Sequence, residues 1–402
     1  MTTTITARPE GPGQARDKAS LNATRLPSLT GMRIIAAGMV FFFHAAYENA
    51  FRSHTAGNVF FWIFGQGGWT GVGFFFVLSG FVLTWSARPT DTVRAFWRRR
   101  VCKIYPNHLV TYLAGLGLLV WAASPIGLGR ALLNLFLLQA WSPSLATETS
   151  VNPVAWSLSC EALFYLCFPL LLRWITKIDE RRLWWYAGGI VAVVLVMPLI
   201  SMTLPQGPHV FFGPITQWQF WLVYVAPPVR LLDFGLGIIL ARIVRSGRWF
   251  NLGLLPSFGL LILGYLAPHV LPYSFCLVAT TIIPVSFVIC AGATADVRGT
   301  RSFLRTGTMV WLGDVSFAVY LWHREVLSNL HRLVGSARSW NTPEAVGMLL
   351  IAAAVTLLLS WALHDLVEIP VMKRWSKPRK KPAGAATPLE PVPLPATGAA
   401  GS

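Results

Sequence analysis

The stretch Met32-Arg-Ile-Ile-Ala-Ala-Gly-Met-Val-Phe-Phe-Phe-His-Ala-Ala-Tyr47 is an apolar helix candidate that carries Arg33 and His44 with ten residues between them. A helix advances about 100° and about 1.5 Å per residue, so eleven steps make three turns plus about 20°. The two side chains therefore share one helix face, about 16 Å apart. A guanidinium and an imidazole on one stripe of a membrane helix are costly, and such residues by default indicate a function.

The composition of the chain is that of a membrane protein. Of its 402 residues 54% are hydrophobic and only 12% are charged, whereas a soluble protein of this length carries roughly twice as much charge. Apolar runs of about twenty residues recur, which indicates an all-α membrane protein with several spans. The formal net charge of +17 lies mainly between these runs, where Lys and Arg set the topology. We therefore expect a lipid bilayer as partner and no nucleic acid.

The apolar runs predict ten transmembrane helices. One further run, Ala131–Trp141, is too short to cross a hydrocarbon core about 30 Å thick, and we expect it to form a short non-crossing or re-entrant helix. The ten predicted spans cover residues 32–50, 69–87, 106–123, 154–175, 183–203, 228–245, 252–268, 273–292, 309–331 and 344–367.

The distribution of Lys and Arg supports this count. Basic residues follow the second, fourth, sixth, eighth and tenth spans, whereas the loops 142–153 and 204–227 contain none. Cytoplasmic loops are the basic ones, so ten spans place both termini in the cytoplasm of a multi-pass protein of the cell (cytoplasmic) membrane. Arg332 and Arg338 lie on the extracytoplasmic side in this topology, against the general trend. Residues 1–27 and the basic, then Pro- and Ala-rich residues 376–402 are expected to be disordered, which leaves residues 28–375 as one ten-helix domain.

Three ionisable side chains fall at one depth in this topology, slightly beyond the middle of the membrane: His44, Glu161 and His323. A carboxylate beside an imidazole raises the basicity of the ring and fixes its tautomer. A general base requires both properties. We therefore expect His44 and Glu161 to be catalytic.

Near the cytoplasmic face, four cations are expected to lie close enough together to hold a polyphosphate: Arg33, Arg99, Arg100 and Lys103. Arg99 could equally be a topology charge. The arrangement predicts a phosphate-headed donor with its head on the cations and its reactive end about 16 Å further along a tunnel. The five cysteines show no metal-ligand spacing, so neither a metal nor a permanently bound cofactor is expected.

Several motifs, each weak alone, follow one another in the order found in the acyltransferase-3 family of integral membrane O-acyltransferases, which the chain resembles from about residue 26 to residue 370. The matching segments are Leu26-Pro-Ser-Leu-Thr-Gly-Met-Arg33 with His44, Gly71-Val-Gly-Phe-Phe-Phe-Val-Leu-Ser79-Gly80-Phe81, Arg100-Val-Cys-Lys103-Ile-Tyr-Pro106, Trp156-Ser-Leu-Ser-Cys-Glu161-Ala-Leu-Phe-Tyr165, Pro228-Val-Arg230-Leu-Leu-Asp233-Phe-Gly-Leu-Gly237, Ser316-Phe-Ala-Val-Tyr320-Leu-Trp-His323 and Glu368-Ile-Pro370.

The resemblance implies a ten-helix fold and transfer of a short acyl group from acyl-CoA, as co-substrate, to a hydroxyl. It implies that His44 is the catalytic member of the family's R-x10-H signature, with Arg33 as its arginine. It also implies that Arg100 and Lys103 hold the CoA, although Lys replaces the family's second Arg and loses bidentate phosphate geometry. Along the tunnel or the acceptor site we expect the remaining motif residues: Ser79, Trp156, Tyr165, Tyr320 and His323. The opening motif looks most like that of actinobacterial enzymes that acylate macrolides or other glycosylated natural products.

Other interpretations remain open for several charged residues. Glu161 could be a structural partner of a buried cation such as Arg230. Arg230 and Asp233, one helical turn apart, are expected to form a structural ion pair. His364 and Glu368, at i and i+4, are expected to pair with each other or with a nearby lysine.

The sequence thus predicts an O-acyltransferase in which His44 takes the proton of an acceptor hydroxyl and the oxygen attacks the thioester directly. One alternative has the same chemistry but a cell-wall or exopolysaccharide glycan as acceptor. A second alternative is a proton-coupled transporter that uses the buried His and Glu as a relay. Transporters built from repeats show broken spans at matching positions of two halves, and this sequence shows none.

Overall fold

The computed structural model describes residues 25–88, 91–250, 252–335 and 339–376. The terminal segments predicted to be disordered, 1–27 and 376–402, lie almost entirely outside these ranges. Within the described ranges the first helix begins at Pro27, whereas the first predicted span begins at residue 32. Proline suits a first helical position because its missing N–H would have no partner inside the helix.

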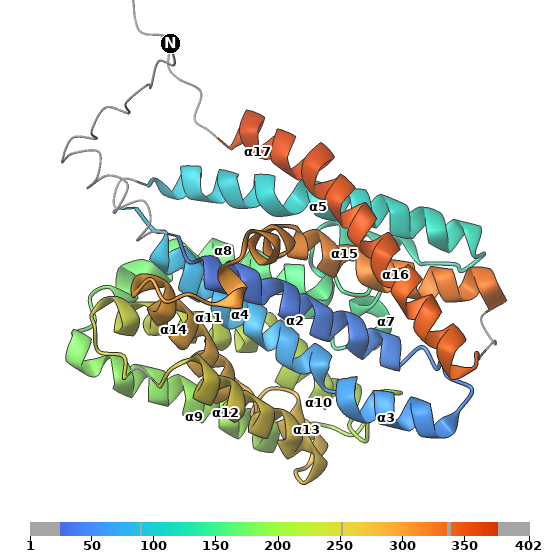
Figure 1. Cartoon of the computed structure of the whole chain (residues 1–402), viewed down its shortest axis with the longest axis horizontal. Coiled ribbons are helices and arrows are strands. Elements are labelled where there is room, and N and C mark those ends of the chain that lie inside the picture. The colour runs from blue at the N-terminus through green and yellow to red at the C-terminus, as the bar shows by residue number, and fades with distance from the viewer. Residues whose placement is uncertain (1–24, 89–90, 251, 336–338, 377–402) are drawn as a thin grey trace, which may run out of the picture.

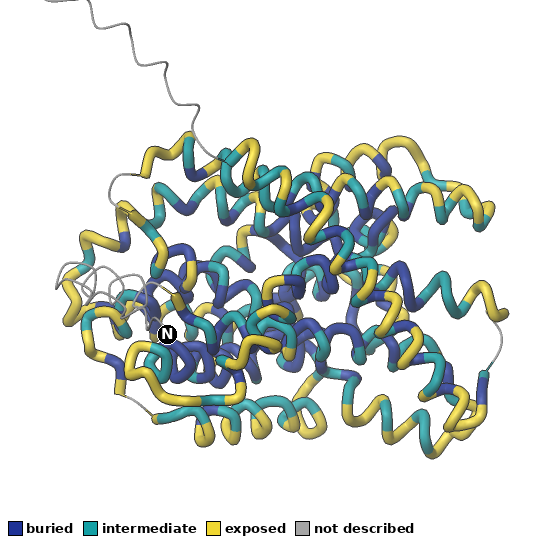
Figure 2. Tube along the Cα trace, turned by 45° about the horizontal axis from the view of Figure 1, so that its top comes forward, coloured by how far each residue is buried: buried dark blue, intermediate teal, exposed yellow. Residues whose placement is uncertain are grey.

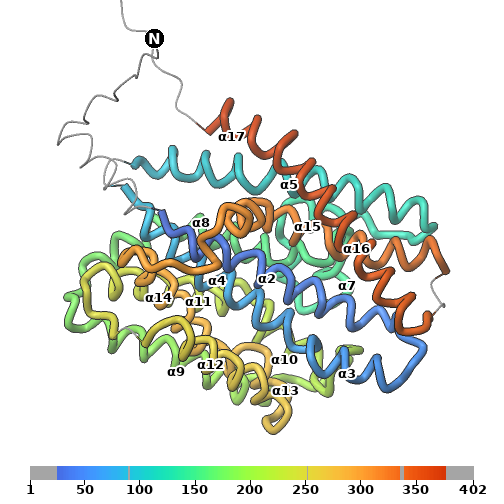
Figure 3. Tube along the Cα trace, in the orientation of Figure 1, coloured from blue at the N-terminus to red at the C-terminus, as the bar shows by residue number. Residues whose placement is uncertain are grey.

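The described chain is helical, and apart from two isolated bridges it contains no strand. Its long helices run in roughly one direction through the molecule (Figures 1 and 3). The longer helices are α2 (Pro27–Ala46), α3 (His54–Phe64), α4 (Gly67–Trp85), α5 (Val93–Trp121), α6 (Leu128–Leu135), α8 (Trp156–Ile175), α9 (Leu183–Ser201), α11 (Pro227–Arg245), α12 (Leu254–Leu266), α14 (Ile282–Val297), α15 (Gly307–Gly335) and α16 (Thr342–Leu363). Among the short segments are α7 (Leu145–Glu148), α10 (Gln217–Phe220), α13 (Tyr273–Cys276), α17 (Ile369–Trp375), the 3-10 turn η1 (Gln139–Trp141) and the π-helical turns η3 (Trp221–Val225) and η6 (His364–Glu368).

Each of the ten predicted spans overlaps a helix. Six helical segments are long and apolar enough to cross a membrane: Pro27–Ala46, His54–Trp85, Trp156–Ile175, Glu180–Ser201, Gln217–Arg245 and Thr342–Trp375. The helices α12 and α14 are apolar but shorter. The helices α5 and α15 have 29 residues each, or about 44 Å, which exceeds the thickness of the hydrocarbon core. The all-helical membrane fold is confirmed, whereas the number of crossings stays a prediction.

Three segments differ from the prediction. The helix α5 begins at Val93, thirteen residues before the expected span 106–123, because the basic stretch that precedes the apolar run is helical as well. The expected single span 273–292 is divided into α13 and α14, because at residues 277–281 the helical ladder gives way to turn bonds such as Thr281 N–H to the carbonyl of Val278 (3.1 Å). The expected loop after residue 50 contains α3, which begins where the Ser53 hydroxyl accepts the N–H of Ala56. That hydroxyl is an ordinary N-cap signal.

The apolar run Ala131–Trp141 does not form one continuous helix. The helix α6 has eight residues, a length of about 12 Å. The chain then turns at Leu137, which has a positive φ of 56°, before η1. A left-handed residue ends a right-handed helix, so this segment is too short to cross, as the sequence predicted.

The helices α4 and α11 pack with their backbones in direct contact at two glycines. A Cβ placed on Gly80 would lie 2.0 Å from the carbonyl oxygen of Phe234, and one on Gly237 would lie 2.0 Å from that of Val77. Small residues allow this close approach between membrane helices. Both glycines belong to motifs of the sequence, and α2 and α11 both pack on the largely buried helix α4. Buried residues gather in the middle of the bundle (Figure 2).

The outer surface of the bundle exposes large apolar side chains. Trp185 is 82% exposed, Leu255 is 85% exposed and Leu263 is 66% exposed. Soluble proteins rarely expose contiguous apolar surface of this kind. Exposed apolar side chains on helices that satisfy their own backbone hydrogen bonds are suited to lipid.

Candidate active site

Two histidines that the sequence places at one depth meet between α2 and α15. The Nδ1 of His44 lies 3.0 Å from the Nε2 of His323, and the two ring centroids are 4.9 Å apart. The Nδ1 of His323 lies 2.6 Å from the carbonyl oxygen of Tyr320, and the Nδ1 of His44 lies 3.0 Å from that of Val40. His323 is fully buried. The two rings therefore form a bonded pair held at both ends by backbone carbonyls.

These contacts determine which ring nitrogens carry protons when both rings are neutral. A carbonyl oxygen only accepts hydrogen bonds, so the Nδ1 of His323 donates to Tyr320 and its Nε2 is an acceptor. The Nδ1 of His44 must then carry the proton that it donates to His323. The Nε2 of His44 is left without a proton, and it is the nitrogen through which a general base acts.

His44 borders a cavity of about 290 Å³ with a largely aromatic wall. Trp156 and Tyr320, both expected near the acceptor, line this cavity. Phe211 also lines it and is 82% exposed, so the cavity reaches the surface at the loop 204–216, which contains no Lys or Arg. We call it the histidine cavity.

A charged cluster that the sequence analysis missed lies next to the histidine pair. Glu48, one turn after His44 on the chain, pairs with Arg324, accepts the hydroxyl of Ser328 at 3.2 Å and lies 3.2 Å from the Nδ1 of His331. Arg324 also lines the histidine cavity. The i+4 position of Glu48 and the adjacency of Arg324 to His323 were visible signals, but only the packing of α15 on the end of α2 brings them together.

Arg33 borders a second, separate cavity of about 130 Å³. Lining it are several residues that the sequence assigned to the donor or the tunnel: Ser79, Arg100, Lys103, Glu161 and Tyr165. The structure thus brings three of the four predicted donor cations to one place, and we call this the cation cavity. Side chains of α4 and α15 flank both cavities, as expected if Arg33 and His44 share one face of α2.

The expected contact between Glu161 and His44 is not made, and this corrects the prediction. Glu161 lies in the cation cavity, where its Oε2 accepts the hydroxyl of Tyr165 at 3.2 Å. The depth of a residue along its helix fixes its level but not the direction of its side chain. Here the carboxyl group shares its cavity with Arg33, Arg100 and Lys103, and His323 takes the place beside His44.

Lys103 is held by residues from the end of the chain. Its Nζ pairs with Oε1 of Glu368, while Nδ2 of Asn107 donates to Oε2 of the same carboxylate at 2.9 Å. The Nδ1 of His364 lies 3.3 Å from Oε1, which confirms the expected pairing of His364 with Glu368. The turn η6 thus anchors α5 in position beside the cation cavity.

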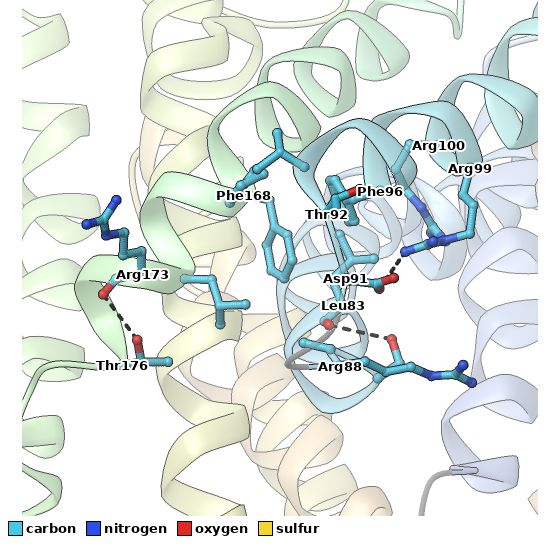
Figure 4. A pocket seen from close by; sticks show the side chains of 15 residues that line it. Leu83, Arg88, Asp91, Thr92, Phe96, Arg99, Arg100, Phe168, Arg173 and Thr176 are labelled. Atoms are coloured by element: carbon cyan, nitrogen blue, oxygen red, sulfur yellow. Dashed lines mark hydrogen bonds and ion pairs between the residues drawn. The ribbon is translucent and has the colours of Figure 1, made fainter. Parts of the chain in front are cut away.

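Arg99 lies in a third and larger cavity, of about 570 Å³, between α5 and α8. It pairs with Asp91 at 2.5 Å, and Figure 4 shows Arg173 on the opposite side of this cavity from Arg99 and Arg100. Arg100 lines this cavity as well as the cation cavity, so the two adjoin at its side chain. Its guanidinium lies 5.9 Å from the ring centroid of Tyr165, within cation–π range.

The predicted continuous tunnel is interrupted. The histidine cavity and the cation cavity share no lining residue. Phe75 lines the cation cavity, Tyr320 lines the histidine cavity, and their ring centroids are 6.1 Å apart in an edge-to-face contact. The Tyr320 hydroxyl donates to the carbonyl of Val154 at 3.2 Å, which holds its ring in this place.

Two further observations bear on the predicted charges. Arg230 and Asp233 form the expected ion pair, 2.9 Å apart and almost fully buried, so Arg230 has its own partner and does not need Glu161. Within the described ranges no three His, Cys, Asp or Glu side chains come together in a way that could hold a metal ion.

The motifs of the sequence led us to expect a bundle of membrane helices with His44 and Arg33 on one helix face and a cation cluster near Arg33, and the structure adds His323 as the partner of His44. A family model described as an acyltransferase domain matches residues 26–365. The chain belongs to this family, acyltransferase-3, and is a multi-pass membrane enzyme that transfers acyl groups to oxygen.

Individual relatives agree with this assignment. The chain is 41% identical to the acyltransferase MdmB of Streptomyces mycarofaciens over 90% of its own length and 95% of that protein. It is 24% identical to the putative acetyltransferase ORF330 of Acidianus two-tailed virus, over 68% and 79% of the two chains. It is also 24% identical to the O-acetyltransferase OatA of Staphylococcus aureus, over 90% of this chain and 61% of that one. No solved structure matches the chain.

Proposed function

We propose that this protein transfers a short acyl group from acyl-CoA to a hydroxyl of a sugar, a macrolide or a related natural product, with His44 as general base. The observation that carries the proposal is the histidine pair, which leaves the Nε2 of His44 unprotonated beside a cavity of about 290 Å³. Orientation of a base by a bonded partner is the usual device for nucleophile activation.

In the proposed reaction His44 Nε2 takes the proton of the acceptor hydroxyl while the acceptor oxygen forms a bond to the thioester carbonyl carbon. The carbon–sulfur bond then breaks and CoA leaves as a thiolate. The proton on His44 passes to that sulfur, which regenerates the neutral pair. His323 stabilises the charged ring because its Nε2 accepts from the Nδ1 of His44 in either state.

The donor's phosphates are proposed to bind Arg33, Arg100 and Lys103, which share the cation cavity. Arginine holds phosphate oxygens in a bidentate manner and lysine as a point charge. The adjoining cavity of about 570 Å³ with Arg88, Arg99 and Arg173 offers room for the nucleotide end of the donor.

The proposed topology has ten crossings and both termini in the cytoplasm of the cytoplasmic membrane. It is supported by the basic residues at the ends of α4, α8 and α11 and by their absence from the loops 142–153 and 204–227. In this topology the cation cavity faces the cytoplasm, where CoA esters are made, and the histidine cavity opens toward the other side.

The experiment that tests the proposal uses the purified full chain in detergent with a short acyl-CoA and hydroxylated acceptors. Free CoA is measured by chromatography and the acylated acceptor by mass spectrometry. His44→Ala is expected to lower turnover by at least about 10²-fold, the usual contribution of a general base. His54→Ala, which removes an exposed histidine at the start of α3, is expected to leave turnover unchanged.

Near-normal turnover of a folded His44→Ala variant would contradict the role of His44. Absence of CoA release under every condition, together with proton-coupled solute uptake in vesicles, would favour the transporter alternative. Acylation of polysaccharide but not of small acceptors would favour the glycan alternative.

A further inference from the structure

A buried carboxyl group in the wall of the histidine cavity has no assigned role in the proposed reaction. Glu148 is the last residue of the four-residue helix α7 and is only 2% exposed. Its Oε2 is fully buried and makes no hydrogen bond to any residue that the structure describes. Burial raises the pKa of this carboxyl group well above its ordinary value. An ionisable group buried without a partner is costly, so it calls for an explanation.

The surroundings of Glu148 are aromatic. The cavity that it lines is also lined by Trp69, Trp156 and Tyr224, whose rings contact one another with centroids 4.7 Å (Trp69–Tyr224) and 5.0 Å (Trp156–Tyr224) apart. The indole Nε1 of Trp69 is also buried without a hydrogen-bond partner among the described residues. The residues that line this cavity thus include one buried acceptor atom and one buried donor atom without a hydrogen-bond partner among the described residues.

The cation that shares this cavity is already engaged. Arg324 lines the cavity but pairs with Glu48. The neighbouring imidazole, His44, is bonded to His323. Neither Arg324 nor His44 pairs with Glu148, so no cation among the described residues neutralises its carboxyl group.

We propose that the histidine cavity binds an acceptor that carries a protonated amine as well as the reacting hydroxyl, with Glu148 pairing with the ammonium between the aromatic rings. Aromatic faces and a carboxylate together are the usual recognition site for substituted ammonium groups. A cavity of about 290 Å³ is at the small end of ligand sites, so it suits one amino-sugar-sized group rather than a whole large natural product. This inference rests on the proposed function, because it names the acceptor of the same site.

The proposal accounts for both unused polar atoms. The ammonium supplies Glu148 with the opposite charge that makes its burial tolerable. The indole N–H of Trp69 can donate to an oxygen of the same acceptor. An acceptor anchored at these two points presents a hydroxyl to the Nε2 of His44, and less translational and rotational entropy is then lost in the reacting step than for an unanchored acceptor.

The test compares two acceptors that differ only in charge: the methyl glycoside of a dimethylamino-deoxyhexose and the methyl glycoside of the corresponding hexose. Glu148→Gln is expected to raise KM for the amino acceptor by about 10- to 100-fold, as loss of a charged hydrogen bond does. KM for the neutral acceptor and for acyl-CoA, and kcat for both acceptors, are expected to stay within about twofold, because Glu148 does not touch the reacting atoms in this proposal. Glu180→Gln, at an exposed carboxylate 54% accessible to solvent, is the control variant.

Binding is measured separately from transfer, by quenching of tryptophan fluorescence in the purified full chain without acyl-CoA. The amino glycoside is expected to bind more tightly than the neutral glycoside in the wild-type protein, and Glu148→Gln is expected to remove that difference. Equal binding of the two glycosides, or an equal change for both in the variant, would overturn the inference. If the amino glycoside binds through Glu148 but no acyl transfer occurs, the proposed function fails while the inference about the ligand stands. If Glu148→Gln does not fold, Glu148→Asp replaces it, since the shorter side chain displaces the carboxylate. An unchanged preference of this variant for the amino glycoside over the neutral glycoside would also overturn the inference.

Discussion

At the histidine pair, the group that would orient the proposed base His44 is a second imidazole ring rather than a carboxylate. His323 contributes no charge, so its effect on His44 is to fix the tautomer and to accept the Nδ1 proton. The contact of His323 with the carbonyl of Tyr320 fixes the tautomer of His323 and, through it, the tautomer of His44.

We predict that His323→Ala lowers kcat by about 10²-fold while KM for acyl-CoA changes little, since only the orientation of the base is lost. His323→Gln is expected to recover part of this activity, because an amide oxygen can accept from the Nδ1 of His44. Steady-state kinetics on both variants, with His54→Ala as control, check the prediction. A His323→Ala variant whose only change is a higher KM for acyl-CoA would show that His323 does not act through the base.

A second prediction concerns the cations. Arg33→Ala and Arg100→Ala are each expected to raise KM for acyl-CoA by about 10- to 100-fold, because each removes charge-assisted bonds to phosphate. KM for the acceptor is expected to remain unchanged, since the acceptor is proposed to occupy the histidine cavity, which has other lining residues. Arg182→Ala, at an exposed position before α9, serves as the control, and equal donor affinity in all three variants would refute the assignment.

At the scale of the elements, the contact between α4 and α11 decides how the cation cavity is shaped. Ser79, which lines that cavity, precedes Gly80, whose Cα faces the backbone of α11. The motif Ser-Gly therefore combines a cavity residue with a packing residue. A shift of α4 would move Ser79 and Phe75 together.

We predict that Gly80→Ala and Gly237→Ala each lower the free energy of unfolding by about 1–3 kcal/mol, because an added methyl group must displace a backbone carbonyl. Gly73→Ala on the same helix is the matched control, since a Cβ at Gly73 meets nothing within 4 Å. Thermal unfolding of the purified variants in detergent measures the difference. Equal stability of the Gly73 and Gly80 variants would show that the helices can separate without cost.

At the scale of the whole molecule, the distribution of charge predicts from which side the donor arrives. Acyl-CoA, the proposed donor, is highly charged and does not cross a bilayer, so it would reach the cation cavity from the compartment that this cavity faces. We predict that sealed inside-out vesicles containing the protein consume external acyl-CoA, whereas sealed right-side-out vesicles do so only after permeabilisation. Chromatography of released CoA provides the measurement. Equal rates in the two sealed preparations would contradict the proposed orientation.

The sequence predicts a large part of this molecule because helix periodicity and membrane thickness are strong constraints. The spacing of Arg33 and His44 predicts their common face, and each apolar run overlaps a helix, although α5 begins thirteen residues before its predicted span and α3 was not predicted. The depth estimate also brings His323 to the level of His44, and the two meet. It fails for Glu161, since depth along α8 says nothing about the direction of the side chain.

Other parts of the site could not be predicted from local sequence. Glu148 ends a helix of four residues with no periodic pattern, so its burial depends on tertiary packing, in which α7 contacts α6 and η1. The pairing of Lys103 with Glu368 joins residues 265 positions apart, and no local pattern specifies such a contact. The break between α13 and α14 depends on turn bonds that an apolar composition conceals.

The ring contact between Phe75 and Tyr320 has a consequence for hydrolysis of the proposed donor in the absence of an acceptor. In the proposed reaction this ring contact must open before the thioester carbonyl reaches His44, and until then it shields the thioester from water that enters from the opposite compartment. Premature hydrolysis would waste an activated metabolite, and a partition of two aromatic rings opposes it without any moving domain. The rate at which CoA is released in the absence of an acceptor therefore reports how well this partition holds.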